Sequence, residues 1–170
     1  TSPADVHIYG LDCGSGSLTP IVDPEPGLPH NRLNDGKCDA AGRYWCGSMN
    51  PESATADGNL YVLDRNLQCR MALADLVTPN GMAWSRDGAT MYLADTRRGY
   101  IYAFAFDAEG GVLGERRIFA DLGAMPGEVT IRTFDSEPEP GGRHLGLRML
   151  QVDPARQAQF EEQIRALLAA

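Results

Sequence analysis

The feature that most constrains the fold is a repeat of about 45 residues. Gly36, Gly81 and Gly127 mark it, at intervals of 45 and 46 residues. Three segments share an aromatic and β-branched run that ends in aspartate, at residues 6–12, 60–64 and 101–107. Each passes through a polar turn into a second strand-like run, at residues 18–22, 70–76 and 116–122. Runs of this kind, bounded by turn residues, predict pairs of β-strands.

A second pattern lies between these pairs and occurs twice, at residues 34–48 and 80–96. Each copy reads as a glycine-led strand, a hairpin turn and an aromatic strand, with turns at Ala41-Gly42 and Asp87-Gly88. Four short strands in every 40–50 residues are typical of a β-propeller blade, whereas a β-sandwich lacks so regular a period. We therefore expect an all-β chain with about two and a half propeller blades.

The third repeat breaks after Gly127, which divides the chain into a repeat region at 1–127 and a tail at 128–170. Alternation of Val129, Ile131 and Thr133 predicts one strand there, and the proline- and glycine-rich residues 136–142 predict a linker. Residues 154–169 predict an amphipathic helix with Asp153 as its N-cap, since Phe160, Ile164, Leu167 and Leu168 form one apolar stripe.

Composition excludes several classes of function. The net charge of −8 argues against nucleic acid as a partner, because binding to phosphates needs clustered lysine and arginine. No apolar run reaches the ~18 residues of a membrane span, and the first residues carry no export signal. The four cysteines form no C-x-x-C pair, so we expect reduced thiols and a cytoplasmic location rather than a zinc finger or a disulfide scaffold.

Two long motifs carry a resemblance to a known family. The first is NRLNDGKCD at 31–39 followed by GRYWCGSM at 42–49, and the second is TPNGMAWS at 78–85 followed by DG at 87–88 and YLADT at 92–96. In this order they resemble the senescence marker protein family, which includes regucalcin, gluconolactonases and luciferin-regenerating enzyme. The resemblance covers residues 5–127. It implies a six-bladed propeller that hydrolyses small lactones, such as sugar-acid lactones. It also implies one bound divalent metal ion, for which calcium is expected and zinc or manganese are alternatives.

The resemblance also implies roles for individual residues. Asn80 matches a metal ligand of the family, and three residues match substrate-contacting positions: Arg32, Asn34 and Glu52. The family's glutamate ligand would precede Thr1, and its aspartate ligand, which is also the expected general base, belongs at 126–128, where this chain has no aspartate. The catalytic residue is therefore unknown. Glu128 is the nearest candidate, although a displacement of two residues should misdirect its carboxylate.

Each of these residues also has a purely structural interpretation. Asn80-Gly81 could form a tight turn, Asn34 could open an Asx turn, and Arg32 could be a surface charge. We expect Asp95 to cap a strand end through backbone hydrogen bonds. We expect the large aromatic residues to form the core between blades rather than a substrate platform: Trp45, Tyr61, Trp84 and Tyr102.

Three functions remain open on the sequence alone. The first is a metal-dependent lactone hydrolase, incomplete in this chain, because six four-stranded blades need roughly 270 residues. The second is a non-catalytic half-propeller that binds a partner or associates with itself through open blade edges. The third is a truncated or frame-altered product without activity.

Overall fold

The computed structural model describes residues 7–121, 130–139, 142–150 and 162. Its regular structure is almost entirely β, and the strands in chain order are β1 (Ile8–Leu11), β2 (Leu18–Val22), β3 (Arg32–Cys38), β4 (Tyr44–Met49), β5 (Gly58–Leu63), β6 (Cys69–Leu76), β7 (Pro79–Trp84), β8 (Thr90–Asp95), β9 (Tyr100–Asp107), β10 (Val112–Leu113), β11 (Arg117–Asp121), β12 (Thr130–Glu139) and β13 (Gly142–Leu150). Within the described ranges, no helix is long and apolar enough to cross a membrane.

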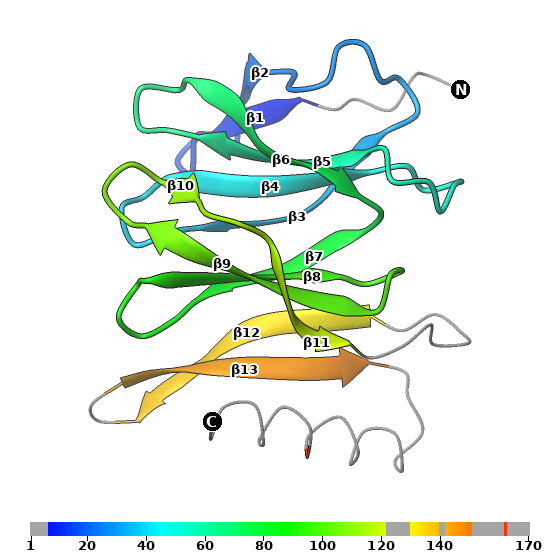
Figure 1. Cartoon of the computed structure of the whole chain (residues 1–170). Helices are drawn as coiled ribbons and strands as arrows, with labels where there is room; N and C mark the ends of the chain where they lie inside the picture. Colours follow the sequence, from blue (N-terminus) through cyan, green and yellow to red (C-terminus); the bar gives the residue numbers. More distant parts are fainter. Residues whose placement is uncertain (1–6, 122–129, 140–141, 151–161, 163–170) are drawn as a thin grey trace.

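The strands form four antiparallel sheets. Strands β3, β4, β5 and β6 make one four-stranded sheet in chain order. Strands β7, β8 and β9 continue in the same way, and both β11 and the short β10 pair with β9. Hairpins β1–β2 and β12–β13 form two further sheets of two strands each. Figure 1 shows the four sheets stacked in chain order, from β1–β2 at one end to β12–β13 at the other.

The main core lies between the two larger sheets. Apolar residues of β4, β5 and β6 meet those of β7, β8 and β9 in a single buried cluster: Trp45, Leu60, Val62, Leu76, Met82, Met91, Leu93, Tyr102, Phe104 and Phe106. Trp45, Trp84 and Phe106 contact one another edge to face. A smaller cluster packs Ile8 of β1 against the other face of the first sheet, onto Cys46, Tyr61 and Leu63. Both faces of β5 are therefore covered, which explains why all six of its residues are buried.

The repeat predicted these strands well. The expected runs at 18–22, 70–76 and 116–122 correspond to β2, β6 and β11. Gly42 and Gly88 take positive φ angles of 77° and 71° in the predicted turns, a conformation that glycine adopts without strain. Trp45, Tyr61 and Tyr102 are buried as expected, whereas Trp84 is half-buried.

Among the described residues of the tail, the predicted linker differs from the expectation. Ser136 to Glu139, predicted as part of a linker, continue β12 and pair with β13, because prolines are tolerated in edge strands. The predicted strand near Ile131 is present from Thr130 onward. Of the predicted helix at 154–169, Glu162 alone lies within the described residues, where its backbone is helical, and Glu128 lies outside them.

The cysteine prediction is confirmed, since Cys13, Cys38, Cys46 and Cys69 are all free thiols. Burial raises the pKa of Cys46 to about 12, so this residue stays a neutral thiol within the core.

Candidate functional site

Two residues of the first motif lie at the start of β3. The pairing of β3 with β4 shifts register between Leu33 and Asp35, so Asn34 is the extra residue of a β-bulge. The Asn34 amide donates to the Pro79 carbonyl of the neighbouring sheet, at 3.0 Å. Arg32 is exposed, and its guanidinium donates to the Leu33 carbonyl and to Asn34 Oδ1, both at 3.1 Å. The bulge thus turns Asn34 toward β7 and leaves Arg32 open to solvent.

Asn80 lies directly before a β-bulge in the next sheet, in which Gly81 is the extra residue. The pairing of β7 with β8 shifts register between Asn80 and Met82, and Gly81 has a φ of 56°. The alternative of a tight turn at Asn80-Gly81 is therefore wrong, because both residues lie within a strand. Asn80 is only 8% exposed, and its side-chain amide forms no hydrogen bond with any described residue.

Two hydrogen bonds between the sheets hold Asn80 in place. The Pro79 carbonyl accepts from Asn34 at 3.0 Å, and the Gly81 amide donates to Asp35 Oδ2 at 2.7 Å. The peptide groups on both sides of Asn80 are therefore attached to consecutive residues of β3. This clamp places Asn34 and Asn80 at the same end of their sheets, with Arg32 bonded to Asn34. Asp35, which accepts one of these two hydrogen bonds, did not stand out in the sequence.

Glu52 lies in the loop between β4 and β5. Arg32 pairs with Met49 at the end of β4, so this loop leaves the sheet at the end where Arg32 lies. Glu52 is exposed. The Arg97 guanidinium, from the turn between β8 and β9, donates to three carbonyls of the loop: Asn50 at 3.2 Å, Pro51 at 3.0 Å and Ser53 at 2.6 Å. Arg97 therefore ties the loop that carries Glu52 to the second sheet.

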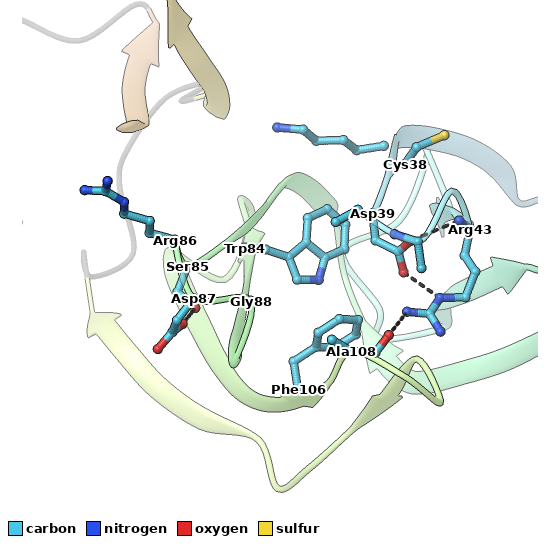
Figure 2. A pocket seen from close by; sticks show the side chains of 13 residues that line it. Cys38, Asp39, Arg43, Trp84, Ser85, Arg86, Asp87, Gly88, Phe106 and Ala108 are labelled. Carbon is cyan, nitrogen blue, oxygen red and sulfur yellow. Dashed lines mark hydrogen bonds and ion pairs between the residues drawn. The ribbon is translucent and has the colours of Figure 1, made fainter. Parts of the chain in front are cut away.

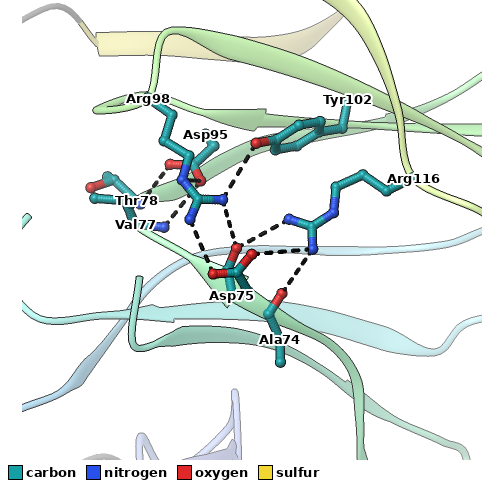
Figure 3. Close-up of polar contacts among 8 residues, drawn as sticks. All are labelled: Ala74, Asp75, Val77, Thr78, Asp95, Arg98, Tyr102 and Arg116. Atoms are coloured by element: carbon teal, nitrogen blue, oxygen red, sulfur yellow. Dashed lines mark hydrogen bonds and ion pairs between the residues drawn. The ribbon is translucent and has the colours of Figure 1, made fainter. Parts of the chain in front are cut away.

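Asp95 has the structural role predicted for it. Its side chain is completely buried and accepts hydrogen bonds from the backbone amides of Val77, at 3.0 Å, and Thr78, at 2.8 Å (Figure 3). Arg98 lies beside it, with Nε 3.7 Å from the carboxylate. Asp95 thereby fixes the chain immediately before Pro79 and Asn80. The buried hydroxyls of Thr78 and Thr96 have no hydrogen-bond partner among the described residues, and the sequence had not singled them out.

Two arginines, Arg98 and Arg116, join this region to the first sheet at Asp75. Asp75 has a positive φ of 64°, and its carbonyl accepts from Arg98 at 2.8 Å and from Arg116 at 3.1 Å (Figure 3). The Arg116 guanidinium also lies over the Tyr102 ring, 5.2 Å from its centroid. These contacts stabilise the strained Asp75 backbone and connect the end of β6 to β9 and to the segment before β11.

Glu25 is a second polar residue that the sequence did not reveal. It is 4% exposed; its Oε1 accepts from Ser48 at 2.6 Å, Asn59 at 2.8 Å and Tyr61 at 2.9 Å, and its Oε2 from Asn31 at 3.1 Å. Burial and the hydrogen bond to Glu25 raise the pKa of Tyr61, so the phenol remains a donor. Because Asn31 directly precedes Arg32, this network anchors the entry to β3.

A cavity of about 500 Å³ lies at the other end of β3 and β7 (Figure 2). Cys38 and Trp84 line it, together with Phe106 and residues of the β3–β4 and β7–β8 turns. Cys38 is four residues beyond Asn34 along β3, a separation of about 13 Å. The cavity is therefore separate from the Arg32–Asn34–Asn80 cluster.

The described residues fit a metal ion only in part. The Asn80 amide oxygen, buried and without a hydrogen bond to the described residues, suits one ligand position of a hard cation such as calcium. Yet in the described part of the chain no three His, Cys, Asp or Glu side chains are grouped so that they could hold a metal. Calcium takes six to eight oxygen ligands, so the described residues do not make a complete site.

Comparison with known proteins gives related lactonases. The chain is 35% identical over 105 residues to pentonolactonase XacC of Haloferax volcanii, which covers 62% of this chain and 35% of that protein. It is 36% identical over 119 residues to L-arabinolactonase of Azospirillum brasilense, covering 68% of this chain and 39% of that protein. The chain thus spans less than half the length of these two relatives.

A solved structure gives the same relationship. The calcium-binding protein regucalcin of Agrobacterium tumefaciens superposes with a TM-score of 0.69 at 29% identity, over 79% of this chain and 45% of that protein. The family profile described as the SMP-30/Gluconolactonase/LRE-like region matches residues 1–137. The chain therefore belongs to the SMP-30/gluconolactonase/LRE-like family.

Proposed function

We propose that this chain carries part of the active site of a divalent-metal-dependent lactone hydrolase. Arg32, Asn34 and Glu52 would contact the lactone, and Asn80 would be one metal ligand. The observation that supports this most directly is the clamp, in which Asn34 and Asp35 bond the peptide groups on both sides of Asn80. The names of two related proteins, a pentonolactonase and an L-arabinolactonase, support a sugar-acid lactone as the substrate class.

We also infer that the stacked sheets are propeller blades. The 45-residue repeat, the antiparallel order of the two larger sheets and the superposition on regucalcin all support this assignment. In it, β3, β7 and β12 are the inner strands, since the backbone of β7 lies close to both β3 and β12. The chain then holds two complete blades and half of each neighbouring blade.

The proposed residue types suit the binding of a lactone. The exposed Arg32 guanidinium carries five N–H donors, of which Nη1 bonds the chain and others remain for ring hydroxyl or carbonyl oxygens of the substrate. Glu52 could accept from sugar hydroxyls, and Arg97 holds its loop in place. A bound metal would supply polarisation of the lactone carbonyl. Glu128 remains the candidate general base.

The test is turnover and binding on the 170-residue chain. We expect hydrolysis of a pentono- or gluconolactone in the presence of calcium, manganese or zinc, and its loss with a chelator. Asn80→Ala should abolish the metal-dependent rate and the heat of metal binding in calorimetry, because its amide oxygen is the proposed metal ligand. Asn66→Ala is the matched control, since Asn66 is exposed in the β5–β6 turn. Absence of turnover with all three metals would refute the proposal for this chain.

A further inference from the structure

Trp84 differs from the other large aromatic residues of the core. It contacts Trp45 and Phe106 edge to face, yet it is only half-buried and lines the cavity at the far end of β3 and β7 (Figure 2). Its Nε1 is buried and has no hydrogen-bond partner among the described residues. The indole surface that faces the cavity is therefore carbon, and it offers an aromatic contact to a ligand.

A buried arginine holds the walls of this cavity in place. Arg43 is 8% exposed, and it donates to Asp39 Oδ2 at 2.6 Å and to the Ala108 carbonyl at 2.7 Å. Arg43 thereby ties the β3–β4 turn of the first sheet to the β9–β10 turn of the second. The β7–β8 turn forms a third wall, in which the Ser85 hydroxyl donates to Asp87 at 2.6 Å. Walls that are fixed before a ligand arrives lose little conformational freedom when it binds.

Small residues open the space between these turns. Ala40 and Ala41 line it from the β3–β4 turn, Gly88 from the β7–β8 turn and Ala108 from the β9–β10 turn. The volume of about 500 Å³ lies within the roughly 300–1,000 Å³ of small-molecule pockets. Because Trp84 forms one side, a planar aromatic ring is the kind of group that makes the most favourable contact there.

The charged side chains of the lining favour an anion. Arg43 and Asp39 neutralise each other as an ion pair at 2.6 Å. The remaining charges are the cations of Lys37 and Arg86 and the carboxylate of Asp87, so the lining is positive in a chain whose net charge is −8. Lys37 and Arg86 each make another contact within the chain, so we assign them an attractive field and no specific bond. Such a field concentrates anions in the cavity.

We propose that this cavity binds a small aromatic carboxylate, with its ring on Trp84 and its carboxylate toward Lys37 and Arg86. The site is separate from the candidate lactone site, since Cys38, which lines the cavity, lies about 13 Å from Asn34 along β3. The inference is independent of lactone hydrolysis. Binding and turnover are measured separately, so either can fail without the other.

The first test follows the two indole N–H signals of the ¹⁵N-labelled chain by NMR. Trp45 and Trp84 are the tryptophans of the sequence, and Trp84→Phe assigns their signals. We expect phenylacetate to shift the Trp84 signal to saturation, with a Kd of roughly 1 mM for so small a ligand. Cyclohexylacetate has the same charge without the aromatic ring, and benzylammonium has the ring with the opposite charge. Each should bind about fivefold more weakly or worse. Absence of a saturable shift, or equal or tighter binding of either comparison compound, would overturn the inference.

A second test locates the bound phenylacetate. Arg86→Gln removes one cation at an exposed position and should weaken binding by about fivefold. Arg117→Gln is the matched control, because Arg117 is an exposed arginine of β11 outside the lining, so the Kd should not change. Arg32→Gln should also leave it unchanged, because Arg32 lies at the opposite end of β3. Weaker binding in Arg32→Gln would place the ligand in the candidate lactone site. That result, an unchanged Kd in Arg86→Gln, or equal losses in Arg86→Gln and Arg117→Gln would each overturn the inference.

Discussion

Replacing Asp95 by alanine tests whether this residue is structural. Asp95 is 0% exposed, and its two oxygens accept from the Val77 and Thr78 amides at 3.0 and 2.8 Å. The variant leaves both amides buried without the acceptor that Asp95 provides. It also removes the carboxylate beside Arg98.

The expected loss follows from these contacts. A buried donor that loses its partner costs about 1–3 kcal/mol, so the two amides together cost about 2–6 kcal/mol. A domain has about 5–15 kcal/mol of total stability, and Asp95→Ala should therefore bring the chain close to unfolding. Asp95→Asn retains one acceptor oxygen and presents an NH₂ group to the other amide, so we expect about 1–3 kcal/mol for this milder variant.

Urea unfolding followed by tryptophan fluorescence measures both variants. Asp87→Ala is the control: Asp87 also accepts from a backbone amide, that of Ala89 at 3.0 Å, but it is exposed, so water replaces the lost bond. It should cost less than about 1 kcal/mol. If Asp95→Ala lies within about 1 kcal/mol of the unsubstituted chain, the burial and bonding argued for Asp95 are incorrect.

Three further predictions concern other parts of the chain. Burial opposes ionisation of Asp39, but hydrogen bonds from Trp45 and Arg43 outweigh this effect and lower the pKa of Asp39 below its ordinary value of 3.8. The ionised Asp39 therefore contributes its full stabilisation above pH ~4, and this contribution is lost as the pH falls through the pKa of the folded state. In acid titration, the stability of Asp39→Asn should depend less steeply on pH than that of the unsubstituted chain. Arg97→Lys keeps the charge but not the three carbonyl bonds, so hydrogen exchange in residues 50–57 should accelerate while the core stays protected. Gly58→Ala should lower the free energy of unfolding in urea by about 1–3 kcal/mol, because a Cβ at this position would collide with the backbone carbonyls of Ser48 and Leu76, the latter at 2.9 Å. An unchanged urea midpoint would contradict this packing.

Most of the fold could be predicted from the sequence because each strand of the repeat has its own local signal. Glycine turns such as Ala41-Gly42 need no information from distant residues, and alternation near Ile131 was enough to predict β12 from Thr130 onward. The predicted linker is wrong at residues 136–139 for the same reason. Proline predicts a break in the strand, but an edge strand needs only half of its amides, so β12 continues through Pro138.

The candidate site was less predictable because its geometry depends on contacts between sheets. The motif indicated Arg32, Asn34 and Asn80 as separate residues. The clamp that joins them uses a carbonyl and an amide of β7, and backbone groups carry no signature in sequence. Sequence does not reveal Glu25 for a related reason. Its four donors come from β4, β5 and the loop before β3, and its own neighbourhood is a short proline-rich segment that is typical of a turn.

The repeat itself explains why Asn80 stands apart from its equivalent. Asp35 and Asn80 each directly precede a marker glycine, in β3 and in β7. Asp35 is directed to the next sheet, where the Gly81 amide satisfies it. The Asn80 side-chain amide has no such bond to a described residue. The repeat thus provides equivalent positions in two neighbouring sheets, and the change from a carboxylate to an amide between them separates a structural tie from a candidate ligand.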